Sequence, residues 1–335
     1  MLEYKDDKWK ALLALAPTLL LMFVFTFYPI VNTVLNAFME GYTYGVWYDT
    51  PSAIGWLEHL GETVMQSSYN SDGELIGTFN QYVGIGLGNF TTIFKDPTFI
   101  RAFKNTSIMV FISVPLTVII GLLISVALNG IKKAQSVLQT IYFLPYVTNS
   151  IALGLVFSVM FGSKNGLINS MIETFGGEKI AWITPLGDQS PTYATCMFVL
   201  MVYTIWNGLA FKILVFLSGM QSIDKQYYQA AQIDATPRWR VFTKITVPLL
   251  SPMIAYILIT SLIGAFKAYS SVIAVFNGRY GPRSNPDMLI TMVGYTYDLL
   301  ASMSVTNAIS KACASALILF ALIMAITVVE LWVSK

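Results

Sequence analysis

The chain has 335 residues, of which 55% are hydrophobic and only 11% are charged, and its formal net charge is +2. Soluble globular proteins are about 25% charged, and a soluble domain, a disordered chain or a nucleic-acid-binding protein needs a charged exterior. The composition excludes these classes and, with a mean hydropathy of +0.63, predicts an integral membrane protein. Cys196 and Cys313 lie in apolar stretches and His59 is the single histidine, so neither a metal site nor a catalytic centre is expected.

Six segments are apolar over the roughly 20 residues that a helix needs to cross a bilayer. The first run follows three lysines, as the core of a signal peptide does, but it is too long and no small-residue cleavage site follows it. We therefore predict an all-α membrane protein with six transmembrane helices. In chain order these are 11–37, 103–128, 137–161, 192–218, 248–276 and 311–332.

Lys and Arg residues predict the orientation of these spans, because short cytoplasmic loops are enriched in them. With the N-terminus inside, the shorter inner segments carry Lys5, Lys8, Lys10, Lys132, Lys133, Lys225, Arg238, Arg240, Lys244 and Lys335. The first outer loop, 38–100, is acidic and has Lys95 as its single base. Both termini are therefore predicted to be cytoplasmic.

These spans also predict the domain organisation. Residues 38–102 are long for a connection, so a small extracytoplasmic subdomain and a partly ordered tether both remain open. The predicted parts are a cytoplasmic N-terminus (1–10), a first transmembrane helix (11–37), the extracytoplasmic segment (38–102) and a five-helix core (103–335) that contains a cytoplasmic loop (219–247).

The cytoplasmic loop between the fourth and fifth spans is predicted to contain two short helices. Residues 226–235 include two adjacent alanines and favour a first helix. Thr236 is predicted to cap a second helix, with Pro237 in its first turn. In that helix Trp239, Phe242 and Ile245 form an apolar stripe at three-residue spacing.

Pro248 is predicted to end the second helix and to begin the fifth span. Taken alone, the pattern also suits an amphipathic hairpin that lies on the lipid headgroups. A resemblance to a known family favours a different interpretation.

The loop resembles the EAA loop of ABC importer permeases, whose pattern is roughly E-A-A-x-x-D-G-A, followed by F, I and L-P. The matching residues are Ala230, Ala231, Asp234, Phe242, Ile245 and Pro248. Gln229, Ala235 and Thr236 replace the usual Glu, Gly and Ala. Segments 25–38, 86–106, 143–169 and 216–223 are similar to the maltose-type carbohydrate permeases, so the resemblance covers nearly the whole chain except residues 40–83.

This resemblance implies the type I ABC importer permease fold in a multi-pass subunit of the bacterial cytoplasmic membrane. The subunit would form half of the translocation path for a carbohydrate, and an oligosaccharide is expected. The implied partners are a second homologous permease, two cytoplasmic ATPase subunits, an extracytoplasmic solute-binding protein and membrane lipid, with no nucleic acid. The chain has no G-x-x-x-x-G-K-[ST] phosphate loop. We therefore expect a permease that is not an enzyme and binds no cofactor, with ATP and Mg²⁺ used by the ATPase.

The resemblance also implies that the loop couples to the ATPase as a docking helix. Gln229 lacks the negative charge usual at its position, and Ala235 adopts a positive φ less readily than glycine. The expected coupling residues are Gln229, Ala230, Ala231, Asp234, Ala235, Thr236, Trp239, Phe242 and Pro248.

A substrate path is implied by the family's sugar contacts in the third to fifth spans. Tyr146, Ser150, Gly208 and Ser261 match residues at those contacts, while Thr204, Asn207 and Phe211 occupy contact positions but differ in type. An aromatic ring can stack on a sugar and hydroxyls can bond to it. Ordinary packing between helices remains the alternative for each of these residues.

Lys212 and Lys267 lie within predicted spans, where a charge is costly and usually functional. The alternatives are snorkelling to an interface, which suits Lys212 near the inner end, or attraction of an anionic cargo such as a uronate oligosaccharide (alginate, for example) or a glycerol phosphate. An ion-coupled secondary transporter is a further alternative. It is disfavoured because no Asp or Glu lies deep in any predicted span.

Overall fold

The computed structural model describes residues 7–42, 46–47, 50–51, 57–69, 75–131, 135–302 and 307–333. Several residues used in the sequence predictions lie outside these ranges: Lys5 and most of the predicted N-terminal segment 1–10, Lys132, Lys133 and Lys335. The chain divides into an N-terminal unit, Met1–Asp96 with Tyr295–Phe320, and a core unit, Pro97–Gly294 with Ala321–Lys335.

The N-terminal unit begins with a long helix. It comprises α1 (Asp7–Met22), the π-helical segment η1 (Phe23–Phe27) and α2 (Tyr28–Phe38). Short strands follow, and the unit continues to α4 (Gly88–Lys95). The strands are β1 (Met39–Glu40), β2 (Val46–Trp47), β3 (Thr50–Pro51), β4 (Thr63–Tyr69), β5 (Leu75–Tyr82) and β6 (Gly84–Ile85), paired antiparallel as β1–β6, β2–β3 and β4–β5.

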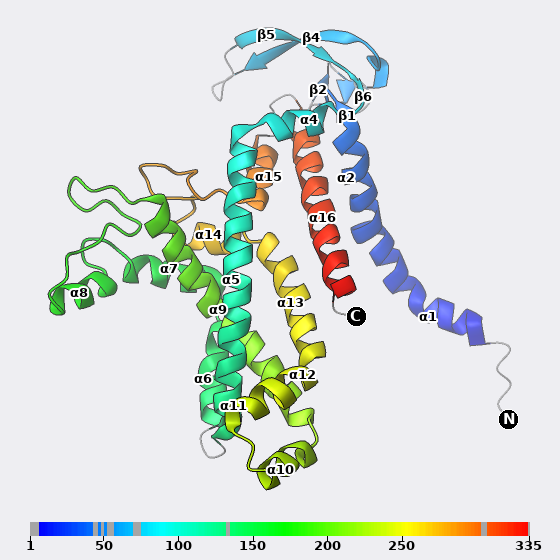
Figure 1. The fold of residues 1–335 in the computed structure, drawn as a ribbon. Helices are drawn as coiled ribbons and strands as arrows, with labels where there is room; N and C mark the ends of the chain where they lie inside the picture. The colour runs from blue at the N-terminus through cyan, green and yellow to red at the C-terminus, as the bar shows by residue number, and fades with distance from the viewer. Residues whose placement is uncertain are drawn as a thin grey trace. The chain divides into compact units, whose positions relative to one another are not determined.

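These strands correct the prediction of an all-α chain (Figure 1). The β4–β5 hairpin joins two runs that contain β-branched and aromatic residues, and the sequence Asn-Ser-Asp-Gly between them is typical of a turn. Hydropathy, which located the spans, carries no information about such a polar hairpin.

Two buried asparagines connect distant segments of the N-terminal unit. The Asn89 Nδ2 donates to the carbonyl oxygens of Ala37 and Met39, each at 3.0 Å. The Asn307 Nδ2 donates to Asn89 Oδ1 at 2.7 Å, while the Gly41 amide donates to Asn307 Oδ1 at 3.1 Å. These bonds fix the end of α2, the start of α4 and the residues that precede α16 against one another.

A buried tyrosine makes a further link in the same unit. The Tyr295 hydroxyl donates to Asp96 Oδ2 at 2.8 Å. Burial raises the pKa of Tyr295, as do this hydrogen bond and the negative charge of Asp96.

The core unit consists of helices. The chain passes between the two units within α15 and again within α16. Among the described residues, eleven segments lie wholly in this unit: α5 (Pro97–Gly130), α6 (Gln135–Val147), α7 (Ser150–Met160), α8 (Leu167–Thr174), α9 (Tyr193–Ser222), α10 (Lys225–Ile233), α11 (Arg238–Val241), η2 (Phe242–Thr246, π-helical), α12 (Val247–Leu249), α13 (Ser251–Phe266) and α14 (Ser270–Val275). Helices α15 (Met292–Ala301) and α16 (Ala308–Val333) are divided between the two units.

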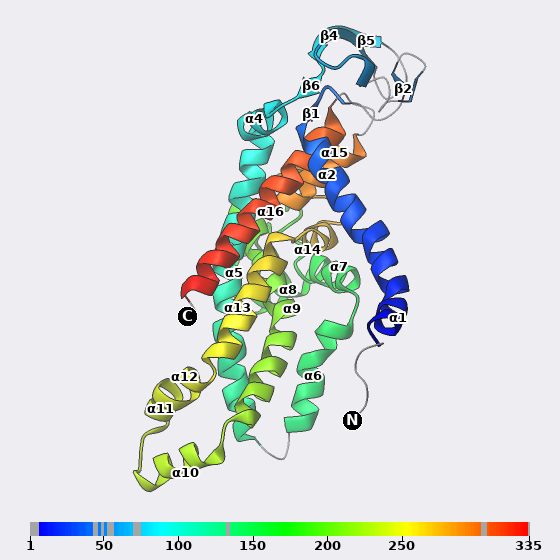
Figure 2. The same ribbon diagram turned by 90° about the vertical axis from the view of Figure 1, so that its right-hand side faces the viewer.

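Helices α5 and α9 run side by side at the centre of the core unit, as two perpendicular views show (Figure 1, Figure 2). Helix α6 packs against α9, α13 packs against α5, and α14 packs against α7. Helix α5 begins at Pro97, six residues before the predicted start of the second span at residue 103. Proline suits the first turn of a helix, and the turn before Phe103 is too polar to register as a span.

Within the described residues, four helices are long and apolar enough to cross a membrane, or up to six if each of two bent pairs counts as one span. The long helices are Leu12–Phe38, Pro97–Gly130, Tyr193–Ser222 and Ala308–Trp332. The bent pairs are Val137–Val147 with Ser150–Met160, at 98°, and Arg238–Leu249 with Ser251–Phe266, at 67°. The structure therefore confirms a multi-pass membrane protein.

The predicted third span, 137–161, is not one straight helix. Its chain bends between α6 and α7, where the Asn149 side chain caps α7 by accepting a hydrogen bond from the Ile151 amide at 2.8 Å. Apolar residues continue through the bend, so hydropathy does not reveal it.

Pro248 does not end the second helix of the cytoplasmic loop, contrary to prediction. The helix continues through it from η2 into α12, and the bend falls at Leu250. In an α-helix the ring of Pro248 would collide with the carbonyl of Lys244, and the wider π turn that precedes it accommodates the ring. The η1 segment ends two residues before Pro29 in the same way. The predicted fifth span, 248–276, is also interrupted between α13 and α14.

The segment between α7 and α9 is held by Asn169, which is completely buried. Its Nδ2 donates to the carbonyls of Ser163 at 2.7 Å and Ile180 at 2.8 Å. Its Oδ1 accepts from Trp182 Nε1 at 2.9 Å and from the Ile180 amide at 3.2 Å. The side chain thus satisfies four buried backbone and indole groups.

Asn169→Ala is expected to open this segment, because the unpaired buried groups would destabilise it by about 3 kcal/mol. Trypsin cleavage after Lys164 and Lys179 would then accelerate on the order of 100-fold. Mass spectrometry of timed digests of the purified protein measures this rate. Asn165→Ala, at an exposed neighbouring position, is the matched control. Equal cleavage rates in the two variants would contradict the assigned role.

Candidate functional site

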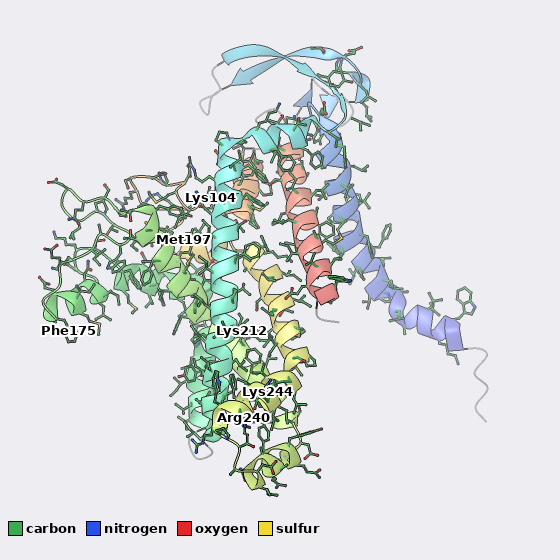
Figure 3. The ribbon with its side chains drawn as sticks, in the orientation of Figure 1. Lys104, Phe175, Met197, Lys212, Arg240 and Lys244 are labelled. Carbon is green, nitrogen blue, oxygen red and sulfur yellow. The ribbon has the colours of Figure 1, made fainter. Side chains whose placement is uncertain are left out.

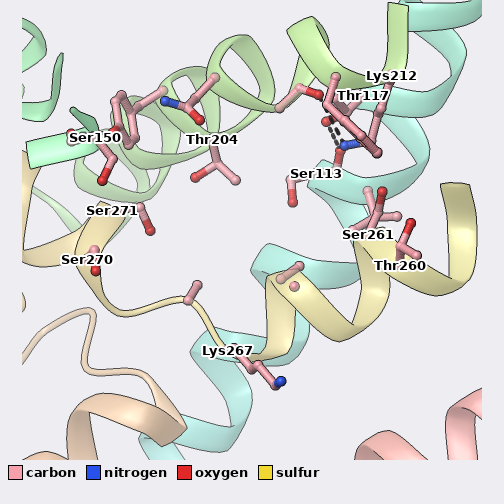
Figure 4. A pocket seen from close by; sticks show the side chains of 18 of the residues that line it. Ser113, Thr117, Ser150, Thr204, Lys212, Thr260, Ser261, Lys267, Ser270 and Ser271 are labelled. Atoms are coloured by element: carbon pink, nitrogen blue, oxygen red, sulfur yellow. Dashed lines mark hydrogen bonds between the residues drawn. The ribbon is translucent and has the colours of Figure 1, made fainter. Parts of the chain in front are cut away.

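A cavity of about 460 Å³ lies in the core unit. Its wall is formed by α5, α9, α13, the end of α6 and the start of α7, together with the break between α13 and α14 (Figure 4). Every residue of the predicted substrate path lines this cavity: Tyr146, Ser150, Thr204, Asn207, Gly208, Phe211, Lys212, Ser261 and Lys267. Predicted path residues from three predicted spans are therefore brought together at one place.

One part of the wall is aromatic. The rings of Tyr146 and Phe211 are stacked, with centroids 5.8 Å apart and an interplanar angle of 22°. Tyr146 is 53% exposed, so its ring is available to a ligand. The Tyr203 hydroxyl donates to the Ser150 carbonyl at 2.7 Å and so fixes the start of α7 against α9.

Other parts of the wall are polar. Asn207 on α9 and Ser261 on α13 form no side-chain hydrogen bond with another described residue, so each offers donors and acceptors to the cavity. A stacking surface combined with amide and hydroxyl groups suits a small ligand that carries several hydroxyls.

Sequence reasoning missed the contribution of α5. Ser113 and Thr117 lie one turn apart on this helix and line the cavity, and Thr260 lies beside Ser261 on α13. The Thr117 Oγ1 donates to the Ser113 carbonyl at 2.5 Å. Two polar residues four positions apart in an apolar span are a signal that could have indicated this face.

Lys212 does not snorkel towards the inner end of its span. The Lys212 side chain is directed towards the N-terminus of α9, where its Nζ donates to the Gly208 carbonyl at 3.3 Å, and the residue is only 8% exposed. The ammonium therefore lies in the wall of the cavity (Figure 4). Lys267 is exposed at the C-terminal end of α13.

The loop between α9 and α13, which the sequence predicts to be cytoplasmic, forms a second candidate site. Helix α10 begins after Asp224, whose Oδ1 accepts from the Gln226 amide at 2.9 Å, and it ends at Ile233, two residues earlier than predicted. The Thr236 amide donates to the Ala231 carbonyl at 2.9 Å and the Ala235 amide to the Gln232 carbonyl at 3.1 Å. These two bonds are the Schellman termination of a helix.

This termination overturns the prediction that Thr236 caps the second helix. The Thr236 amide closes α10, while Pro237 precedes α11 without a side-chain cap. Ala235 has a φ of +49°, a left-handed conformation that costs a non-glycine residue about 1–2 kcal/mol. The turn therefore keeps its sharp form although it lacks glycine.

The predicted coupling residues divide into an inner and an outer group. The inner group, Ala231, Ala235, Thr236 and Phe242, lines a cavity of about 560 Å³ between the loop and the ends of α5 and α9. The outer group, Gln229, Ala230, Asp234, Trp239 and Pro248, is exposed. The Tyr228 hydroxyl lies 3.3 Å from Thr246 Oγ1 and links the two helices of the loop.

The outer surface of the loop also has an apolar residue that sequence reasoning missed. Ile233 is 85% exposed at the end of α10 and Trp239 is 72% exposed on α11. The Trp239 and Phe242 rings lie 5.5 Å apart. The sequence signal that could have indicated this exposed apolar position is a single isoleucine within a polar segment of the loop.

The fold is that of a type I ABC importer permease. A crystal structure of a bacterial ABC transporter involved in the import of the acidic polysaccharide alginate is similar, with a TM-score of 0.75 and 20% identity, over 99% of this chain and 97% of that chain. The alginate ABC transporter crystallised with its alginate pentasaccharide-bound periplasmic protein gives a TM-score of 0.74 and 19% identity, over 98% and 95% of the two chains.

Residues 113–334 match the family of binding-protein-dependent transport system inner membrane components, and this chain belongs to that family. The lactose transport system permease protein LacF of Rhizobium radiobacter is 32% identical over 217 residues, 64% of this chain and 69% of LacF. The arabinooligosaccharide permease AraP of Bacillus subtilis is 29% identical over 215 residues, 64% and 65% of the two chains. The resemblance seen in the sequence is thus confirmed.

Proposed function

We propose that this chain is a transmembrane subunit of an ATP-driven importer and forms half of the translocation path for a carbohydrate. The observation that carries the proposal is the cavity, which gathers the stacked Tyr146 and Phe211 rings with the free polar groups of Asn207 and Ser261. Relatives named for lactose and for arabinooligosaccharides support a carbohydrate as the cargo.

The same proposal includes the arrangement in the membrane. Each bent helix pair counts as one span, which gives six spans with both termini in the cytoplasm of a bacterium. The positive charges of the loop that contains Arg238, Arg240 and Lys244 support this orientation (Figure 3).

The proposed partners are a second homologous permease, two cytoplasmic ATPase subunits and an extracytoplasmic solute-binding protein. ATP and Mg²⁺ would be used by the ATPase subunits. The exposed apolar surface of Ile233 and Trp239, next to Gln229, Ala230 and Asp234, would dock to the ATPase. Closure of the ATPase pair would then move this loop, and the helices attached to it, as a rigid body.

Reconstitution tests this function. The importer, purified with its copurifying subunits, is placed in proteoliposomes with its binding protein, and uptake of radiolabelled oligosaccharides is measured. We expect uptake that requires ATP inside the vesicles and the binding protein outside. Uptake that proceeds without ATP and follows an imposed ion gradient would contradict the proposal and favour a secondary transporter.

A further inference from the structure

The bundle is built closely around the side chain of Lys212. A Cβ added to Gly121 of α5 would lie 3.2 Å from the Lys212 Cβ, and one added to Gly208 of α9 would lie 3.2 Å from the Lys212 Nζ. Glycine at these two positions therefore leaves room for the lysine stem and for its ammonium. The Lys212 side chain therefore packs against α5 and against the preceding turn of α9 at the cavity wall.

The charge of this ammonium is not balanced by the surrounding protein. An ammonium carries three N–H donors, and among the described residues its one hydrogen bond is to the uncharged Gly208 carbonyl. The described residues that line the cavity include no Asp or Glu. A buried charge within a membrane is costly and is normally paired, so an acidic partner is expected from outside the described part of the chain.

The surroundings of Lys212 suit an anionic group on a ligand. The hydroxyl-bearing side chains of Ser113 and Thr117 lie beside the ammonium, with Ser261 nearby on α13 (Figure 4). The positive charge of Lys267 lies on the same cavity wall, closer to solvent. The Thr117 hydroxyl already donates to the Ser113 carbonyl, which leaves the Ser113 hydroxyl as the available donor. An ammonium with a hydroxyl donor beside it is a typical set of partners for a carboxylate or a phosphate.

We infer that the cargo is an anionic carbohydrate, one that carries a carboxylate or a phosphate, and that Lys212 pairs with this group during passage. This inference rests on the proposed function, because it specifies the substrate class of the same cavity. Neutral sugars would leave the ammonium unpaired in the loaded cavity and would be disfavoured for that reason.

The experiment compares matched neutral and anionic probes in the reconstituted importer with its binding protein. The pairs are maltotriose with trigalacturonate, and glucose with glucose 6-phosphate; the two anionic probes distinguish a carboxylate from a phosphate. We expect ATP-dependent uptake of at least one anionic probe over its neutral partner. Lys212→Met should reduce that uptake about 10- to 100-fold, and Lys212→Arg should retain much of it.

Lys104→Met is the matched control, because it removes an exposed lysine of the same core unit outside the cavity (Figure 3). ATP-dependent uptake of the neutral probes alone would overturn the inference and leave the proposed function standing. No ATP-dependent carbohydrate uptake would instead overturn the proposed function. Unchanged uptake by Lys212→Met would also overturn the inference. Loss of the copurifying second permease from Lys212→Met, with that subunit retained by Lys212→Arg, would overturn it as well, because Lys212 would then pair with an acid of that subunit.

If Lys212→Met fails to assemble, the wild-type probe selectivity and the Lys212→Arg variant still decide the outcome. Preference of the wild type for neutral probes contradicts the inference whatever the variants do.

Discussion

Replacing Ile233 by aspartate is expected to abolish ATP-driven uptake while the permease remains folded in the membrane. Ile233 is 85% exposed and lies in the cytoplasmic loop with the exposed Trp239, so it contributes little to the stability of the chain itself. Burying an isoleucine against a partner is worth about 1.5–3 kcal/mol, and a buried unpaired carboxylate adds a penalty of several kcal/mol. A total of about 4 kcal/mol lowers the affinity for the ATPase roughly 1,000-fold.

Copurification of the ATPase with the tagged permease measures this loss, and uptake is measured in parallel. Phe175→Asp is the matched control, since Phe175 is 88% exposed and follows α8, outside the cytoplasmic loop (Figure 3). Ala231→Arg is a weaker test of docking, because Ala231 is only 6% exposed and its replacement would disturb the loop itself. ATPase recovery from Ile233→Asp equal to that from Phe175→Asp would contradict the docking surface.

Gly154→Leu is expected to prevent accumulation of folded permease. Helices α7 and α14 approach so closely that a Cβ on Gly154 would lie 2.2 Å from the Ala274 Cβ and 2.9 Å from the Ala274 carbonyl carbon. The obstacle includes backbone, so a rotamer change cannot relieve it. Even Gly154→Ala should destabilise the protein by about 1–3 kcal/mol, and leucine should cost considerably more.

Size-exclusion chromatography of the detergent-solubilised protein measures folded yield, and thermal unfolding measures the Tm of Gly154→Ala. Gly264→Ala is the control, because a Cβ there meets nothing within 4 Å. Its Tm should stay equal or rise, since alanine is favoured over glycine within a helix by about 0.5–1 kcal/mol. A wild-type yield and Tm for Gly154→Leu would show that α7 and α14 do not pack in this way.

The class of protein, a membrane protein, and the positions of its long helices were predictable from local sequence. Helices α5, α9 and α16 each carry a long and mostly apolar run, and hydropathy sums such a run without reference to the rest of the fold. The β4–β5 hairpin was missed because its polar sequence carries no comparable signal.

The candidate site was predictable in part. Most of the path residues were identified through a family resemblance, which supplies positions on α6, α7, α9 and α13 but omitted Ser113 and Thr117 of α5. Lys212 and Lys267 were identified as charges within predicted spans. The contribution of α5 depends on which face packs against α9, and that is decided by contacts between segments far apart in the chain.

Sequence by itself thus determined that this is a multi-pass membrane protein of charge-poor composition, with a loop of recognisable pattern between α9 and α13. The tertiary structure alone decided where the third and fifth apolar segments bend, and that Lys212 is directed into a cavity instead of towards an interface. The physical reason is that apolar length and charge count are properties of a segment. Bends and the surroundings of a side chain are instead decided by the helices that pack against the segment, as Gly121 of α5 packs against Lys212 of α9.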